Sequence, residues 1–371
     1  MPNKLLIITG IYPPDSGGPA KFAREFSDWL STEGVEVLVI TYSSTQINKF
    51  PKSSPVISEV DRNQTLPKRF LKFVHRVGSF SNKNQNVLVA GAFIEAYVAS
   101  IIYRFSYIAK VPGDIVWERA RNNKVTSLNI EDFQEHPLNF KYKIFRILYS
   151  RSLSRAKFVI VPSLGLYKLC LKWGVSESKL RLIYNSVESE IESKYYPSLQ
   201  KDNLITVCRL TPWKGVDELI EYVARRNLTL VVVGDGPDRL RLESLALALN
   251  ANVVFKGEVA HQKVLALLLQ SQLFVLNSYY EGLPHALVEA RVAGVLSVGR
   301  AGTGSAEVIN DDQDGFLVRS DRPLEETLDL AIQMQPSSDS MITLAKEDSL
   351  KRFSKAANFP LILKLFLREV R

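Results

Sequence analysis

Disulfide bonds and protein-bound metal ions have little basis in this sequence. Its 371 residues include two cysteines, Cys170 and Cys208, which lie far apart and lack the spacing typical of metal ligands. Such cysteine usage excludes a small domain held together by disulfides and is typical of a reducing compartment. We therefore expect a fold that depends on hydrophobic cores rather than on disulfides, and a chain of this length has room for two such cores.

A membrane-spanning segment is also lacking. The longest apolar stretch, residues 87–103, contains Glu95 and ends before Arg104. This composition favours a short strand, residues 87–90, followed by a buried helix. A secretory signal is not expected either, because residues 12–14, Tyr-Pro-Pro, cut short the apolar start of the chain. The sequence thus predicts a cytoplasmic protein.

The positive net charge is not accompanied by a nucleic-acid-binding motif. Lysine and arginine outnumber aspartate and glutamate by 47 to 39, a net charge of +8, but no helix-turn-helix, zinc-finger or RNA-binding signature is present. Some of the charge lies in residues 68–76, where basic residues alternate with Phe70, Leu71, Phe73 and Val74 at near-helical spacing. Such a helix could rest on an anionic membrane surface. Its apolar stripe could also pack on its own domain, which we favour.

Strand-like and helix-like segments alternate along the chain, which predicts an α/β fold with parallel sheets. Residues 1–186 form the first predicted domain and residues 203–349 the second. The polar residues 187–202 between them, which include Pro197, are the predicted linker.

The segment from Glu281 to Glu289, Glu-Gly-Leu-Pro-His-Ala-Leu-Val-Glu, is the most informative part of the sequence. Pro284 suits the first position of a helix, where its missing N–H would have no partner in any case. The N–H groups of the first turn would then face an anion at the positive end of the helix dipole. Carboxylates on both sides are placed to bind sugar hydroxyls. The pattern predicts a site for a nucleotide sugar, and the alternative is an ordinary capped helix with two solvated glutamates.

Two other segments place glycines or basic residues directly after strand-like runs. Gly17 and Gly18 follow the first such run, and the absence of side chains lets the backbone approach a bulky ligand. Arg209 and Lys214 follow another, where arginine offers a fork to two phosphate oxygens and lysine adds a point charge. A plain turn and two solvated basic residues are the alternatives. The second anion site downstream makes the solvated basic residues the weaker interpretation, whereas the plain turn stays open for the two glycines.

A further glycine segment, Gly234-Asp-Gly-Pro237, ends the strand-like run at residues 229–233. It is a weak signal for a dinucleotide site, because Arg239 occupies the place of the third glycine. It is natural as one more strand-to-loop junction that lines a ligand cleft.

Taken in order, these motifs resemble the family-4 retaining glycosyltransferases of GT-B fold, in their bacterial type. Further matching segments are Phe255-Lys-Gly257, Asn185-Ser-Val187, Ala306-Glu-Val-Ile309 and Asp314-Gly-Phe-Leu317. The resemblance runs from the first strand to about residue 320. It implies two Rossmann-like parallel-sheet domains facing a central cleft, and a final helix over residues 350–371 that crosses back to the first domain.

The resemblance also implies a role for each matching residue. Gly17 and Gly18 would approach the donor phosphates, and Arg209 and Lys214 would hold the diphosphate and offset the charge that builds on the leaving group. Glu281 would contact the donor sugar. The remaining donor-binding residues that it implies are Gly234, Phe255, Lys256, Gly282, Leu283, Pro284, His285 and Glu289, with Glu289 on the ribose and Phe255 and Lys256 at the nucleobase. Family members need no divalent metal and no cofactor beyond the sugar nucleotide.

The first domain departs from the family pattern where the reacting sugar carbon is expected. Many relatives have a His-Asp pair after a strand, whereas this chain has Val111-Pro-Gly-Asp-Ile-Val-Trp-Glu-Arg119. Asp114, Glu118 and Arg119 are therefore candidates for orienting donor or acceptor, and a carboxylate near the sugar can act as a general base. The alternative is a structural ion-pair cluster.

The sequence thus predicts a metal-independent retaining glycosyltransferase of the hexosyl type. Its substrates would be a nucleoside-diphosphate sugar and a glycan or lipid-linked acceptor, in the synthesis of a cell-surface polysaccharide such as lipopolysaccharide. A nucleotide-sugar epimerase and a catalytically silent nucleotide-sugar-binding protein of the same fold are the alternatives. Peripheral contact with the inner face of the plasma membrane through residues 68–76 is a further expectation, and nucleic acid is not an expected partner.

Overall fold

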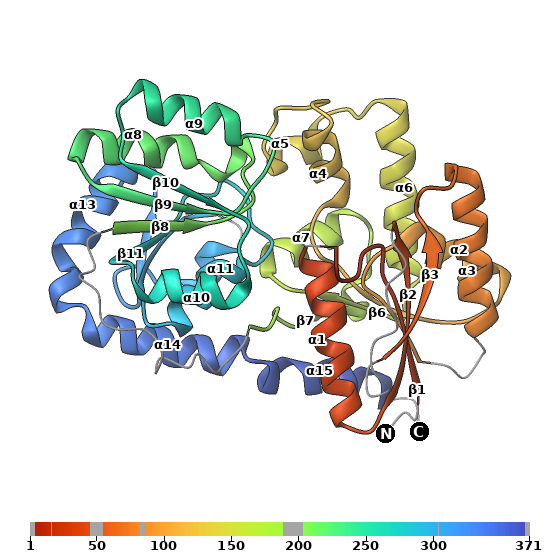
Figure 1. Ribbon diagram of the computed structural model, residues 1–371. Helices are drawn as coiled ribbons and strands as arrows, with labels where there is room; N and C mark the ends of the chain where they lie inside the picture. Colours follow the sequence, from red (N-terminus) through yellow and green to blue (C-terminus); the bar gives the residue numbers. More distant parts are fainter. Residues whose placement is uncertain are drawn as a thin grey trace. The chain divides into compact units, whose positions relative to one another are not determined.

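The computed structural model describes residues 4–15, 17–44, 55–81, 86–187, 203–302 and 304–367. The chain divides into two compact units, one of residues 1–183 with 359–371 and the other of residues 184–358. Each unit is built on a sheet of parallel strands with helices packed on its faces (Figure 1). The predicted α/β class with two Rossmann-like parallel sheets is confirmed.

The first unit alternates strands and helices from β1 onward. Its strands are β1 (Lys4–Ile8), β2 (Glu36–Ser43), β3 (Val56–Asp61), β4 (Asn86–Val89), β5 (Ile108–Lys110), β6 (Phe158–Val161) and β7 (Leu180–Leu182). Its helices are α1 (Gly18–Thr32), α2 (Leu66–Phe80), α3 (Phe93–Ile102), α4 (Ile115–Asn122), α5 (Ile130–Glu135), α6 (Phe140–Arg155) and α7 (Leu164–Lys172). The described strands lie in the order β3-β2-β1-β4-β5-β6-β7, so the strand order reverses between β1 and β4.

Helix α1 shows how the sequence covers this sheet. Its buried residues Ala20, Ala23, Phe26 and Leu30 recur every three or four positions and therefore form one apolar stripe. The stripe packs in the same core as β1, in which Leu5 and every later residue of the strand is fully buried. Burial of such an apolar face, rather than helix propensity, provides most of the stability of a helix in a protein.

The last described helix, α15 (Lys355–Leu367), belongs to both units. Residues up to Asn358 are part of the second unit, and residues from Phe359 are part of the first. The ring of Phe359 lies 5.2 Å from that of Phe26 and 5.6 Å from that of Trp29. The helix runs through Pro360. Pro360 lies in the second turn of the helix, so its missing N–H removes a single hydrogen bond near the amino-terminal end.

The second unit also alternates strands and helices. Its strands are β8 (Asn203–Val207), β9 (Thr229–Val233), β10 (Val253–Gly257), β11 (Leu273–Leu276), β12 (Leu296–Arg300) and β13 (Phe316–Val318). Its helices before α15 are α8 (Val216–Arg226), α9 (Arg239–Ala248), α10 (His261–Leu269), α11 (His285–Val292), α12 (Ser305–Val308), α13 (Leu324–Met334) and α14 (Asp339–Phe353). The described strands lie in the order β10-β9-β8-β11-β12-β13.

Two apolar cores cover the two faces of this second sheet. In β9, Leu230 and Val232 pack in one core with helices α8 and α13, and Val231 and Val233 pack in the other with α10 and α11. This alternation follows from the pleat, since neighbouring residues of a strand point to opposite faces. A continuous apolar run is therefore what a parallel strand covered on both faces requires.

The predicted domain limits differ in detail from the two units. Of the predicted linker 187–202, residues 188–202 lie outside the described residues, and Val187 pairs with Ser354. The predicted end of the second domain, residue 349, falls within the continuous helix α14, and the change of unit comes after Asn358. Within the described part of the chain, no helix has both the length and the apolar character needed to cross a bilayer.

Candidate functional site

The carboxyl ends of β8 and β11 are neighbours where the strand order of the second sheet reverses. Open parallel sheets bind ligands at this position. The loop after β8 carries Lys214 and the loop after β11 carries Glu281, and Nζ of the lysine lies 2.5 Å from Oε1 of the glutamate. The two side chains are 15% and 13% exposed, so the pair is largely shielded from water. The structure thus brings together two residues that the sequence placed in one site.

Two glycines allow the backbone to pack closely around this pair. Gly215, with φ of 61°, follows Lys214 in the left-handed conformation, and a Cβ there would lie 2.6 Å from Asn277. Gly304, with φ of 65°, lies in the loop after β12, and a Cβ there would lie 2.8 Å from the carbonyl oxygen of Glu281. Both positions require glycine. The loop that carries Glu281 is therefore in close contact with the loops from β8 and β12.

Helix α11 begins beside Glu281. Pro284 occupies the cap position rather than the predicted first helical position, and the helix begins at His285. The first N–H groups of the helix still lack acceptors within it and form the positive end of its dipole. Glu289 is only 7% exposed, and its Oε1 lies 3.9 Å from Nε2 of His261 in α10. Neither Glu281 nor Glu289 is thus the solvated side chain of the alternative interpretation.

The other predicted donor residues of the second unit differ in their surroundings. Arg209 is exposed and, within the described residues, has no ion-pair partner. A Cβ on Gly234 would lie 2.0 Å from the carbonyl oxygen of Cys208, so this glycine is needed for packing of the loop after β9. Phe255 packs against the core, and Lys256 is exposed at an irregularity in the pairing of β10. Burial raises the pKa of the Cys208 thiol to about 11, so the thiol is not a nucleophile at neutral pH.

Gly17 ends the loop that follows β1 in the first unit, and Gly18 is the first residue of α1. Both are exposed, and Gly17 has a φ of 138°, a value that L side chains rarely adopt. A Cβ on Gly18 would meet no other atom within 4 Å, so the space beside the first turn of α1 is open. This opening is compatible with the predicted approach of a ligand.

Asp114 is fully buried and holds three helices together. Its Oδ1 accepts hydrogen bonds from the backbone N–H groups of Val116 and Trp117 at the start of α4, at 3.0 and 3.1 Å. Its Oδ2 accepts from Gln134 of α5 at 3.0 Å and from Arg146 of α6 at 2.9 Å. A carboxylate with both oxygens engaged and no exposure lacks access to a substrate proton. Of the two interpretations, the structure therefore favours the structural ion-pair cluster for Asp114.

The other two residues of that motif are more accessible. Glu118 is half-buried, and Arg119 is exposed with its guanidinium over the ring of Phe145, 4.5 Å from the centroid. They lie two turns or less from the capped start of α4, so the buried cluster around Asp114 fixes the helix that carries them. Glu118 thus remains the accessible carboxylate of the motif.

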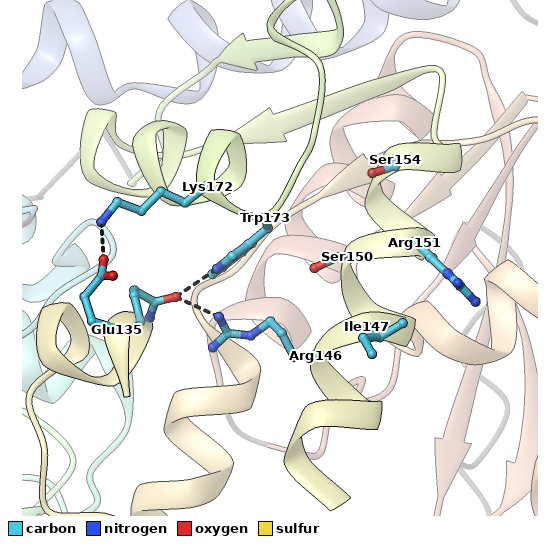
Figure 2. A pocket seen from close by; sticks show the side chains of 9 residues that line it. Glu135, Arg146, Ile147, Ser150, Arg151, Ser154, Lys172 and Trp173 are labelled. Carbon is cyan, nitrogen blue, oxygen red and sulfur yellow. Dashed lines mark hydrogen bonds and ion pairs between the residues drawn. The ribbon is translucent and has the colours of Figure 1, made fainter. Parts of the chain in front are cut away.

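Beside the Asp114 cluster lies an open pocket of about 640 Å³, which Figure 2 shows. Arg146 and the indole of Trp173 both donate to the Oε1 atom of Gln134, at 2.7 and 2.9 Å. Lys172 and Glu135 form an ion pair of 2.9 Å at its edge (Figure 2). Most polar groups of this pocket bind one another. The pocket is therefore chiefly the solvent-facing side of the cluster around Asp114.

Helix α2 contains the basic segment predicted at residues 68–76. Phe73 is fully buried and Val74 nearly so, and the ring of Phe73 lies 4.4 Å from that of Tyr42 in β2. Arg76 donates to Ser58 of β3 at 3.2 Å. Phe73 and Val74 therefore pack on their own domain, as the favoured interpretation predicts, because this face of the sheet needs an apolar cover. Leu71, in contrast, is 66% exposed. Contact of residues 68–76 with a membrane stays a prediction.

Sequence reasoning missed a polar cluster behind Lys214. Asn277 directly follows β11 and is 1% exposed, and Arg300 ends β12. Arg300 pairs with Glu218 of α8 at 2.8 Å and lies over the ring of Tyr279, 4.2 Å from its centroid. Arg300 also lines an open pocket of about 1140 Å³ between the strand ends and α13. The available signal was the one used for Arg209, a polar residue at the end of an apolar run.

Comparison with known sequences identifies relatives of most of the chain. Residues 188–348 match the family described as Glycosyl transferases group 1. The chain is 26% identical over 350 residues to an uncharacterized glycosyltransferase of Methanocaldococcus jannaschii, with 87% of each chain covered. It is 24% identical over 338 residues to the N,N'-diacetylbacillosaminyl-diphospho-undecaprenol alpha-1,3-N-acetylgalactosaminyltransferase of Campylobacter jejuni, with 88% of this chain and 84% of that protein covered.

Solved structures resemble the chain over almost its entire length. The Anabaena protein HepE in complex with UDP and glucose matches with a TM-score of 0.76 and 17% identity, covering 98% of this chain and 99% of that one. Sucrose-phosphate synthase from Thermosynechococcus elongatus matches with a TM-score of 0.78 and 17% identity, covering 99% and 98%. At these identities the likeness shows a common fold.

Proposed function

Because residues 188–348 belong to the glycosyl transferases group 1 family and the chain has the GT-B fold, we propose that it is a retaining, metal-independent glycosyltransferase. The donor is a nucleoside-diphosphate sugar of the hexose type, and the acceptor is a glycan or a lipid-linked saccharide. The observation that supports this most is the shielded pair of Lys214 and Glu281 at the carboxyl ends of β8 and β11, beside the start of α11.

The proposed chemistry needs positive charge where the donor diphosphate leaves. When the bond from the anomeric carbon to the phosphate oxygen breaks, negative charge grows on the diphosphate. Lys214, Arg209 and the positive end of helix α11 are the groups of this unit that stabilise that charge. Glu281 has two roles in this site. Its carboxylate orients the Lys214 ammonium and can accept hydrogen bonds from the hydroxyls of the donor sugar. The acceptor hydroxyl oxygen forms its bond to the anomeric carbon as the bond to the phosphate oxygen breaks, and its proton passes to the departing diphosphate.

Glu289 extends the same site along helix α11. Its burial on the first turns of the helix places a carboxylate at a fixed position beyond the anion-binding N–H groups. A ribose has two neighbouring hydroxyl donors, which a carboxylate accepts well. In the first unit, Glu118 is the carboxylate that we assign to orienting the reacting sugar or the acceptor, in place of the buried Asp114.

The relative from Campylobacter jejuni, by its name, acts on an undecaprenol-linked saccharide. This supports a lipid-linked acceptor and a role in polysaccharide or lipid-linked glycan synthesis. Such an acceptor lies in a membrane, so a surface of this chain should contact lipid headgroups.

Helix α6 presents a surface suited to that contact. Phe140, Ile144 and Ile147, which we call the α6 stripe, are 79%, 41% and 41% exposed and lie at helical spacing. The helix contains no acidic residue, and its exposed lysines and arginines include Lys141 and Arg151. Apolar side chains flanked by basic ones fit an anionic membrane, because the first enter the headgroup zone and the second bind phosphates. We therefore propose α6 as a peripheral membrane contact.

A thermal-shift panel of UDP, GDP and their sugars, without added metal, tests the donor site. A ligand that binds only the folded state raises its apparent stability by mass action. We expect one nucleotide to stabilise the wild type and the Lys346→Ala control, which removes an exposed lysine of α14, and to stabilise Lys214→Ala much less. No shift with any nucleotide would contradict the proposal.

Turnover separates the enzyme from its alternatives. The stabilising sugar nucleotide, incubated with an undecaprenyl-diphosphate-linked saccharide, should release its nucleoside diphosphate and extend the saccharide by one sugar. Binding without release would indicate a silent sugar-nucleotide-binding protein, and conversion of the donor sugar without transfer would indicate an epimerase.

A further inference from the structure

We propose that Arg300 and Asn277 are positioning residues that hold Lys214 opposite Glu281. This inference rests on the proposed function, in which Lys214 and Glu281 bind the donor. It assigns a role to two side chains that are hydrogen-bonded to each other, and one of them to the backbone of Gly215. They act through the backbone of the loop that carries Lys214.

The first link joins Asn277 to that loop. Residues Pro212–Lys214 form a short 3-10 helix, and Gly215 follows in the left-handed conformation. The Nδ2 atom of Asn277 donates to the carbonyl oxygen of Gly215 at 3.0 Å. The missing side chain of Gly215 leaves room for Asn277, since a Cβ would lie 2.6 Å from that same nitrogen. The amide therefore fixes the backbone directly after Lys214.

The second link fixes the orientation of the Asn277 amide. The Nε and Nη2 atoms of Arg300 both donate to Oδ1 of Asn277, at 2.9 and 2.6 Å. An amide group has a donor end and an acceptor end, and only one orientation serves both Arg300 and Gly215. Because Asn277 is 1% exposed, water does not replace these partners. Arg300 thereby determines that Nδ2 faces the loop.

Arg300 is in turn held by two groups of α8 and the loop after β11. Its Nη2 pairs with Glu218 at 2.8 Å, and its guanidinium stacks on the ring of Tyr279. The Tyr279 hydroxyl donates to the same carboxylate. The backbone N–H of Tyr279 donates to the carbonyl oxygen of Trp213 at 2.9 Å, which gives the Lys214 loop a second attachment to the loop after β11.

One guanidinium thus connects the segments that form the site. Arg300 ends β12, Asn277 follows β11 on the segment that leads to Glu281, and Gly215 follows the loop from β8. The distance between Lys214 and Glu281 depends on the positions of these loops relative to one another. A displacement of about 1 Å at such a position lowers the efficiency of a site by up to about a hundredfold.

Two conservative substitutions test the links separately. Arg300→Lys keeps the charge and can still pair with Glu218, but a lysine cannot donate to Asn277 through a rigid fork. Asn277→Asp keeps an acceptor for Arg300 and replaces the donor to Gly215 by an oxygen. We expect each variant to bind UDP or GDP, whichever stabilises the wild type, about tenfold more weakly in calorimetric titration. Hydrogen exchange of the backbone at residues 211–216 should be faster in both.

A double substitution shows whether Arg300 acts through Lys214. In the Lys214→Ala background, Arg300→Lys should weaken nucleotide binding no further, since the group it positions is gone. If Arg300→Lys instead weakened nucleotide binding by the same factor in Lys214→Ala as in the wild type, Arg300 would act independently of Lys214. That result would overturn the proposal. The control is Arg226→Lys, which alters an ion pair of 2.6 Å with Asp329 on the same pocket but away from the loop. It should leave both measurements unchanged.

The outcomes distinguish this inference from the proposed function. Weaker binding in Lys214→Ala together with wild-type binding and exchange in Arg300→Lys and Asn277→Asp would overturn the positioning role alone. Wild-type nucleotide binding in Lys214→Ala would overturn the donor site and the positioning role together.

Discussion

Asp114 and Lys110 are buried charged residues of the first unit with different surroundings. Asp114 is surrounded by hydrogen-bond donors from α4, α5 and α6. Lys110, at the end of β5, is 5% exposed and lies 4.7 Å from the ring centroid of Phe22 in α1. Desolvation by burial lowers the pKa of Lys110 to about 7. Burial thus destabilises the charged form of Lys110.

Replacing Asp114 by asparagine should destabilise the first unit and leave the donor site intact. The change removes the negative partner of Arg146 inside the protein, and loss of one partner of a buried pair costs about 3–5 kcal/mol. We expect a lower urea midpoint for the first unit and unchanged nucleotide affinity. Glu131→Gln, on the exposed side of α5, is the matched control. A variant that keeps its stability but loses transfer would restore Asp114 as a catalytic candidate.

Lys110 should make stability depend on pH. Its folded-state pKa of about 7 lies below the ordinary value of 10.5, so between these values the unfolded chain binds more protons than the folded one. Stability should therefore rise with pH across this window, by at most about 1.4 kcal/mol per pH unit. The difference between wild type and Lys110→Met in urea unfolding at pH 7, 8 and 9 isolates this contribution from other groups. A constant difference over this range would contradict the assignment.

At the scale of elements, the starts of α6 and α7 are marked in the sequence by capping residues, Asn139 and Ser163, whose side chains accept from N–H groups of the first turn. The exposure of the basic helix α2 was harder to predict. An amphipathic helix has the same spacing whether its apolar stripe meets a sheet or a membrane. The order of strands decides between these outcomes, and β3 and β2 beneath α2 supply the sheet.

The proposed contact of the α6 stripe with a membrane can be tested by substitution. Ile144→Glu with Ile147→Glu places two negative charges at the proposed lipid-facing surface, where both insertion and attraction to anionic headgroups are opposed. We expect this variant not to float with phosphatidylglycerol vesicles. Lowering the salt concentration should not restore flotation. The matched variant changes four basic residues of α2, Lys68, Arg69, Lys72 and Arg76, to serine. Loss of flotation in the α2 variant alone would return the contact to residues 68–76.

At the scale of the molecule, much of the second unit's site could be predicted from strand ends. Lys214 and Glu281 each follow an apolar run, and parallel sheets bring such ends to one edge. The bond between Arg300 and Asn277 could not be predicted, because it depends on β11 and β12 being neighbours and on rotamers that only packing selects. The burial of Asp114 was hidden for the same reason, since Gln134 and Arg146 reach it from later helices.

The chain passes from the second unit to the first after Asn358, within α15. This predicts that the later part of the helix stabilises the first unit. Phe359 is 1% exposed in the core of the first unit, with aromatic contacts to Phe22, Phe26 and Trp29. Truncation of a buried phenylalanine to alanine costs about 3–5 kcal/mol through lost burial and the cavity that remains. Phe359→Ala should therefore lower the unfolding midpoint of the first unit, although the residue comes after the whole second unit in the sequence.

Hydrogen exchange followed by mass spectrometry distinguishes the two units in that experiment. In Phe359→Ala, peptides from α1 and β1 should exchange faster, while peptides from β8 and β9 should exchange at the wild-type rate, because cooperative units open separately. Leu361→Ala, a change on the same helix at a residue that is 43% exposed, should alter neither set. Equal acceleration of both sets in Phe359→Ala would mean that the two units unfold as one, and the end of α15 would then stabilise the whole molecule rather than the first unit.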